Sequence, residues 1–137
     1  MIYMYNVNYL HILVAAVVAM IAGYLWYSPY LFGNQWAKLS GMKMDGGSKQ
    51  DMQKTYGISY LLAVVTAYMM SYFIGYLQVT TFMGAVQLAF MLWLGFAMPP
   101  MATNYLFKKT SQQLFFLETG HVLFAMVAIA VTLVLWV

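Results

Sequence analysis

Residues 7–27 read VNYLHILVAAVVAMIAGYLWY, a stretch without a charged side chain that is rich in Val, Ala, Ile and Leu. A helix needs about 20 predominantly apolar residues to cross a bilayer, so this stretch predicts a membrane-spanning helix. Three further stretches of similar character follow, at 56–77, 82–104 and 114–136. We therefore predict an all-α polytopic membrane protein with four transmembrane helices, built as a single domain over residues 1–137.

The predicted helices and connections have the following approximate bounds. The helices occupy 7–27, 49–78, 82–104 and 114–136, and the connections between the first and second and between the third and fourth are residues 28–48 and 105–113. The second helix is expected to begin before it enters the membrane, because Ser48 and Asp51 form a capping box at its start.

Composition limits the class of protein. Six Lys and three Asp or Glu are the only charged side chains among 137 residues, and this 7% is far below the share of about 25% in soluble domains. An ordinary soluble enzyme is therefore excluded, and the 64% of hydrophobic residues excludes intrinsic disorder.

The few Lys are scattered and there is no Arg, so we expect no nucleic-acid partner. There is no Cys, and no His lies beside Met42 and Met44, the pair among the thirteen Met that invites a copper site, so we expect no metal and no cofactor.

Lys placement predicts the orientation. Every Lys falls in or beside the two long connections, so the positive-inside rule makes these connections cytoplasmic and puts both termini outside. The expected location is the cell (inner or plasma) membrane. In the first connection, Asn34 can cap a short interfacial helix that carries Trp36 and ends at Gly41. Trp26 and Tyr60 are expected at the level of the inner headgroups.

Small residues recur every four positions on the first two predicted helices. They are Ala15, Ala19 and Gly23 on the first helix and Ala63, Ala67, Ser71 and Gly75 on the second. Small side chains let helix backbones approach closely in lipid, so we interpret both series as packing faces, within one subunit or between subunits. The expected partners are the lipid bilayer and further copies of the chain, with a twofold dimer favoured as the commonest symmetry.

Glu118 is the one carboxylate inside the predicted spans, and it shares a stripe of the fourth helix with His121. Ionisable side chains inside the membrane are candidates for function by default, so both residues are candidates for binding a ligand or handling an ion or proton. His11 and Gln87 form a second polar level nearer the outer face. Trp93, between the two levels, is a further candidate, although packing is the alternative interpretation.

A proline pair interrupts the third predicted helix. Pro99 and Pro100 cannot donate to the carbonyls of Gly95 and Phe96, so we expect a kink near 93–98.

Several short motifs resemble a known family. They are Trp26-Tyr27-Ser28-Pro29, then Phe32-Gly33 and Trp36, and on the third helix Trp93-x-Gly95-Phe96. The sequence resembles the uncharacterised bacterial membrane proteins catalogued as domain of unknown function 1761, over nearly the whole chain. The resemblance implies a small four-helix membrane protein, and it implies neither an established activity nor catalytic residues.

Three functions compete at this point. The first is an oligomeric carrier or channel-like protein for a small solute, an ion or a proton, with Glu118 as the group that handles it. The second is a non-catalytic structural or accessory subunit of a larger membrane complex. The third is an enzyme, because Glu118 and His121 have the spacing of carboxylate-bridged di-metal bundles. Such a site needs further carboxylates that the spans lack, so we predict no catalytic residue.

Overall fold

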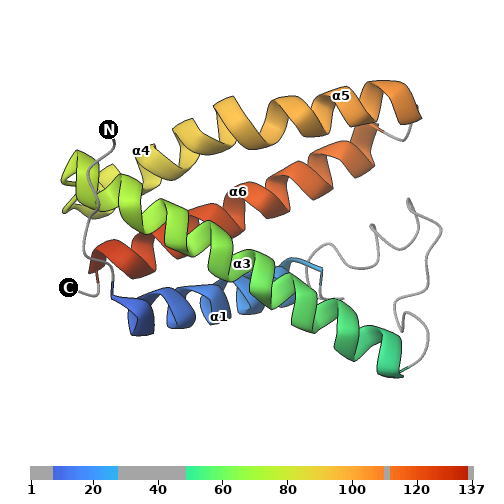
Figure 1. The fold of residues 1–137 in the computed structure, drawn as a ribbon. Helices are drawn as coiled ribbons and strands as arrows, with labels where there is room; N and C mark the ends of the chain where they lie inside the picture. The colour runs from blue at the N-terminus through green and yellow to red at the C-terminus, as the bar shows by residue number, and fades with distance from the viewer. Residues whose placement is uncertain (1–7, 28–48, 110–111, 136–137) are drawn as a thin grey trace.

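The computed structural model describes residues 8–27, 49–109 and 112–135, and every regular element in these ranges is helical. In chain order the elements are α1 (Tyr9–Trp26), α3 (Lys49–Leu77), α4 (Phe82–Leu92), the π-helical turn η1 (Trp93–Ala97), α5 (Met98–Lys108) and α6 (Gln112–Leu135). α4, η1 and α5 follow one another without a break and form one long helix (Figure 1).

The predicted fold class is confirmed. Four helical stretches are long and apolar enough to cross a membrane, and they are Tyr9–Trp26, Gln53–Leu77, Phe82–Lys108 and Gln112–Leu135. The direction in which they cross stays a prediction. The proposed interfacial helix around Trp36 lies outside the described residues.

Local capping explains where two of the helices begin. The Asn8 side chain accepts a hydrogen bond of 3.2 Å from the backbone N–H of His11 and so caps α1. The hydroxyl of Thr81 accepts one of 3.0 Å from the N–H of Gly84 and caps α4. Each bond satisfies a backbone donor that the first turn of a helix leaves without an internal partner.

The third membrane-spanning stretch is longer than predicted from the sequence. Its predicted end lies near Asn104, whereas α5 continues to Lys108. Tyr105, Leu106 and Phe107 extend the apolar surface, and the alkyl stem of Lys108 can carry its ammonium group toward the headgroups. The helix ends because Lys109 adopts a left-handed conformation with φ 54°, and its N–H bonds to the Tyr105 carbonyl at 2.9 Å.

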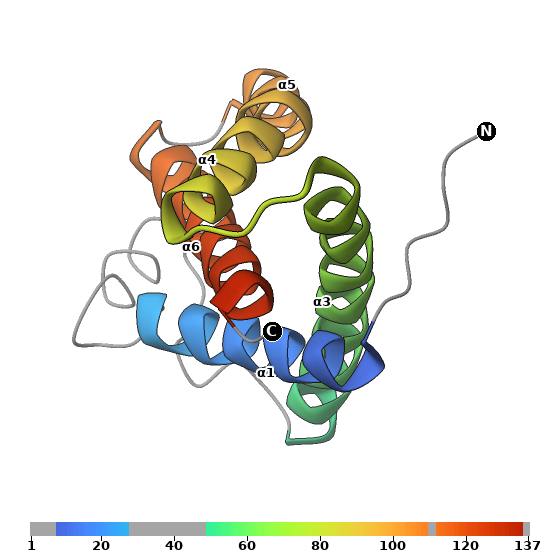
Figure 2. The same ribbon diagram turned by 90° about the vertical axis from the view of Figure 1, so that its left-hand side faces the viewer.

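Helix α6 lies at the centre of the arrangement. It contacts α1 and α3 on one side and α4, η1 and α5 on the other (Figure 2). α1 also packs along α3. The hydroxyl of Tyr60 on α3 donates to the Leu13 carbonyl at 3.1 Å, in the first half of α1. Tyr60 thus does not lie level with Trp26 as expected, because α3 crosses α1 obliquely (Figure 1).

The core between these helices consists of small and aliphatic side chains. Its buried residues are Ile12, Ala15, Ala19, Ala67, Met70, Ala85, Ala89, Ile129, Ala130 and Val134. Six of these ten residues are alanines, five on α1, α3 and α4 and one on α6. The helices are therefore in contact through close approach of their backbones rather than through interdigitated large side chains. Large apolar side chains such as Leu61, Met83 and Phe107 lie on the outer surface, where lipid would solvate them.

The irregularity expected near the proline pair takes the form of a π-helical turn. In η1 the N–H of Met98 bonds to the Trp93 carbonyl, five residues back. Pro99 and Pro100 follow directly, and the carbonyls four residues before them, those of Gly95 and Phe96, lie within η1. The helix therefore continues across the prolines by taking one extra residue into a single turn.

Candidate functional site

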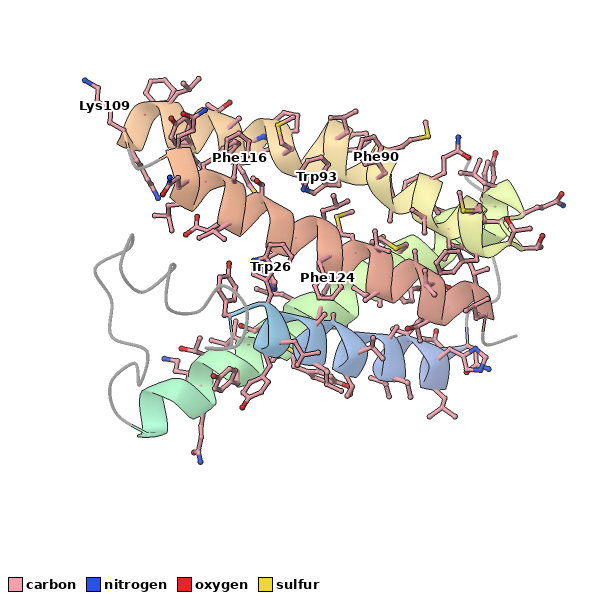
Figure 3. All side chains as sticks on the ribbon, turned by 180° about the vertical axis from the view of Figure 1, so that it is seen from behind. Trp26, Phe90, Trp93, Lys109, Phe116 and Phe124 are labelled. Carbon is pink, nitrogen blue, oxygen red and sulfur yellow. The ribbon has the colours of Figure 1, made fainter. Side chains whose placement is uncertain are left out.

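Two tryptophan indoles fix one turn of α6 from opposite sides. The indole N–H of Trp26, at the end of α1, donates to the Leu117 carbonyl at 3.0 Å, and that of Trp93, in η1, donates to the Thr119 carbonyl at 2.9 Å. Figure 3 shows the two rings on either side of α6. The two acceptors directly precede and follow Glu118, so the backbone that carries the carboxylate is held on both sides.

The Trp26 ring reaches α6 because Gly120 has no side chain. A Cβ at Gly120 would lie 2.9 Å from Cζ2 of Trp26 and 3.2 Å from its Cη2. The same ring packs against Phe124, with the ring centroids 5.7 Å apart. The close approach places the indole N–H within bonding distance of the Leu117 carbonyl.

His121 occupies an equivalent crevice on α1. A Cβ at Gly23 would lie 2.8 Å from Nε2 of His121, so the imidazole lies directly over the glycine. The Tyr27 ring flanks it, with centroids 4.9 Å apart and an angle of 51° between the planes. Gly23, predicted as a packing residue, thus also makes room for a candidate functional side chain.

Tyr27 links His121 to Glu118. It follows the last residue of α1, just outside the first membrane-spanning stretch. Burial, and to a smaller extent the negative charge of Glu118, together raise the pKa of the Tyr27 phenol to about 12. The phenol therefore stays neutral near pH 7, and Glu118, Tyr27 and His121 form one polar cluster at the α1–α6 contact.

Glu118 also borders a hollow between α5 and α6. The hollow has a volume of about 240 Å³, and its lining residues are Met101, Asn104, Tyr105, Lys108, Leu114, Phe115 and Glu118. Two of the lining residues, Tyr105 on α5 and Phe115 on α6, stack on each other, with ring centroids 4.9 Å apart and an angle of 26° between the planes. The hollow thus combines a carboxylate, an ammonium group, an amide and a phenol with apolar walls.

Other candidates lie away from this cluster. His11 is half-buried near the start of α1, about 18 Å along the helix from Gly23 and hence from His121. Gln87, Gly95, Pro99 and Pro100 are exposed on the third membrane-spanning stretch, and Phe96 is 77% exposed. Ser28, Pro29, Phe32, Gly33 and Trp36 lie outside the described residues.

The packing residues of the two small-residue series face other helices to different degrees. Ala15, Ala19, Ala67 and Ser71 are buried, whereas Gly23, Ala63 and Gly75 are half-buried. Within residues 8–27, 49–109 and 112–135, no group of three or more His, Cys, Asp or Glu could hold a metal ion.

Sequence reasoning missed the α5 side of the hollow. Asn104 closes the third predicted helix, and Tyr105 and Lys108 fall in the predicted connection. Once the helix is extended to Lys108, Asn104 and Lys108 share one face at a spacing of four. This spacing of four is the sequence feature from which the α5 side of the hollow could have been predicted.

Fold and site together define a small helical protein with four stretches able to cross a membrane and a polar cluster near one end of its central helix. The chain belongs to the family described as "Protein of unknown function (DUF1761)", whose profile matches residues 10–134. The resemblance seen in the sequence motifs is thereby confirmed. No curated protein and no solved structure gives a significant match to the chain.

Proposed function

We propose that this protein is an oligomeric carrier or channel-like protein of the cell membrane for a small solute, an ion or a proton. In this proposal Glu118 binds or carries the transported species. The observation that carries the proposal is the position of Glu118, which lines the hollow between α5 and α6 together with Asn104, Tyr105 and Lys108.

The free energy of an intramembrane carboxylate supports this assignment. A charged carboxylate within a span is costly unless water, a cation or polar side chains surround it, and such residues usually mark ion or substrate pathways. Glu118 lines an open hollow, and its charge acts on Tyr27 nearby. The carboxylate is therefore accessible to a ligand from the hollow.

The rest of the path would need more than one copy of the chain. The core between α1, α3, α4 and α6 consists of side chains such as Ile12, Met70, Ile129 and Val134, which form a barrier to water. A route beyond the hollow would form between copies or open by rearrangement, and a twofold dimer is the simplest assembly that offers one.

Flux through proteoliposomes tests the proposal. Purified protein is reconstituted, and proton and sodium flux are followed with trapped fluorescent indicators, for the original chain and for Glu118→Gln. The expected result is a decrease of at least about tenfold, since the neutral amide loses the charge that attracts a cation. Gln112→Ala is the matched control, because Gln112 is exposed on the same helix and does not line the hollow.

Two results would overturn the assignment. One is flux through Glu118→Gln equal to that of the original chain, and the other is equal loss in Gln112→Ala. Circular dichroism and elution volume of both variants establish that a loss of flux does not reflect unfolding.

An accessory subunit of a larger membrane complex is the second candidate. It is favoured by the low burial of two of the stretches, Gln53–Leu77 and Phe82–Lys108, in each of which only 17% of an apolar segment of 18 residues is buried within the chain. These surfaces could receive partner helices as well as lipid. Mild-detergent extraction of the tagged chain from its native membrane distinguishes the two, since stoichiometric co-purification of other membrane proteins supports the accessory function and a homogeneous homo-oligomer contradicts it.

A further inference from the structure

The two charged residues of the hollow lie at different depths. The stacked rings of Tyr105 and Phe115 place these two residues at the same level of the antiparallel helices α5 and α6. Lys108 lies three residues nearer the end of the bundle, and Glu118 lies three residues further in. With a rise of about 1.5 Å per residue, their Cα atoms differ by roughly 9 Å along the helix axes.

The wall between the two charges suits a short alkyl chain. The Tyr105–Phe115 pair lies midway and Leu114 adds apolar surface beside it, while Met101 lies at about the depth of Glu118 or slightly beyond. Asn104, one turn before Lys108 on the same face, offers both a donor and an acceptor. The alkyl chain of Lys108 is flexible, so the position of its ammonium group can adjust to the length of a molecule bound in the hollow.

We infer that the hollow binds a short soluble zwitterion, with its primary ammonium group at Glu118 and its carboxylate or phosphate at Lys108. This inference rests on the proposed function in that the ligand would be the solute that Glu118 handles. An ω-amino acid of three to four backbone carbons has the required chemistry, because a few methylene groups separate its two charges. The volume of about 240 Å³ accommodates a molecule of this size.

The order of the two charges favours a free solute over a lipid headgroup. In phosphatidylethanolamine the phosphate is attached to the glycerol and lies nearer the hydrocarbon than the ammonium group does. The hollow has the opposite arrangement, with the anion-binding Lys108 at the end of α5 and the carboxylate deeper. A zwitterion that enters from water with its ammonium group first matches this arrangement.

Binding measurements on the full chain test the inference. The protein is placed in phosphatidylcholine nanodiscs and titrated calorimetrically with 4-aminobutanoate, butylamine and butanoate. We expect 4-aminobutanoate to bind at least about tenfold more tightly than either of the other two, because only the zwitterion makes both charge-assisted contacts. Glu118→Gln and Lys108→Gln should each weaken its binding by about tenfold or more.

Lys109 supplies the matched control. It neighbours Lys108 but does not line the hollow, so Lys109→Gln should leave binding unchanged. Equal affinity for the three compounds would overturn the inference, as would equal losses in Lys108→Gln and Lys109→Gln. Competition by phosphatidylethanolamine added to the nanodiscs would also overturn it, in favour of a lipid headgroup.

Binding and flux separate the inference from the proposed function. If 4-aminobutanoate binds selectively but the reconstituted protein moves neither it nor the two ions, the ligand class stands and the carrier function fails. If Glu118-dependent flux of protons or sodium occurs while 4-aminobutanoate binds no better than butylamine, the ligand class fails and the carrier function stands.

Discussion

Substitution of Gly120 by alanine tests the contact that joins α1 to α6. The new Cβ would lie 2.9 Å from Cζ2 of Trp26, whereas carbon atoms in contact are normally about 3.5–4.0 Å apart. The indole would have to withdraw by roughly 0.6–1 Å. The N···O distance from the indole to the Leu117 carbonyl, now 3.0 Å, would become too long for a hydrogen bond.

The free energies decide the sign of the effect. Loss of the hydrogen bond costs about 0.5–1.5 kcal/mol. Overpacking costs about 1–3 kcal/mol. Alanine recovers about 0.8–1 kcal/mol through its higher helix propensity. The expected net change is a loss of about 0.5–3.5 kcal/mol in the free energy of unfolding.

Unfolding by sodium dodecyl sulfate in mixed micelles, followed by circular dichroism, measures this change. Gly57→Ala is the control, since nothing lies within 4 Å of a Cβ at Gly57, and it should be neutral or stabilise by up to about 1 kcal/mol. Trp26→Phe removes both the indole N–H and the obstructing ring atoms, so Gly120→Ala should cost at least about 1.5 kcal/mol less in that background. Equal stability of Gly120→Ala and Gly57→Ala, or a cost that Trp26→Phe does not reduce, would refute the reasoning.

Three further predictions concern other contacts. Trp93→Phe keeps an aromatic ring but loses the donor to the Thr119 carbonyl, so the free energy of unfolding should fall by about 0.5–1.5 kcal/mol in the same micelle assay, and no loss would show that this bond contributes nothing. Because burial raises the pKa of Tyr27 to about 12 from 10.0, the unfolded chain loses this proton first, and stability should fall as pH rises from 10 to 12. Tyr27→Phe should show a smaller fall over that window, and an identical pH profile would contradict the shift. Thr81→Ala removes the cap from the Gly84 N–H and should cost about 1 kcal/mol, with hydrogen exchange speeding up first in the opening turn of α4.

The sequence was sufficient for the number and composition of the spans because charge is so scarce. Each apolar stretch between charged clusters became a helix, and the Thr81 cap separates α3 from α4 within a region that has no charge at all. The end of the third stretch could not be predicted in this way. The prediction ends this stretch near Asn104, whereas Asn104 lies within α5 and lines the hollow.

The lateral contacts were less accessible from sequence. Glu118 and His121 could be singled out as rare polar side chains within a span, but their neighbours depend on the relative rotation of helices far apart in the chain. Trp26 and Leu117 are 91 residues apart, and nothing local indicates that this indole finds that carbonyl. Depth predictions from sequence also assume parallel helices, and the predicted level of Tyr60 is wrong because α3 crosses α1 obliquely.

The extra residue in η1 sets the rotational phase of everything that follows it. Each residue turns a helix by about 100°, so the stripe of α4 that begins with Ala85 and Ala89 would continue through Phe96, Thr103 and Phe107 in an uninterrupted α-helix. In the structure Phe96 and Phe107 are 77% and 84% exposed, and the side facing α6 instead holds Met101, Tyr105 and Lys108. Removal of one residue from η1 would therefore rotate Phe107 toward α6 and turn Lys108 away from the hollow. The extra residue in η1 thus determines which side chains of α5 face Glu118, although η1 lies about three turns before Lys108.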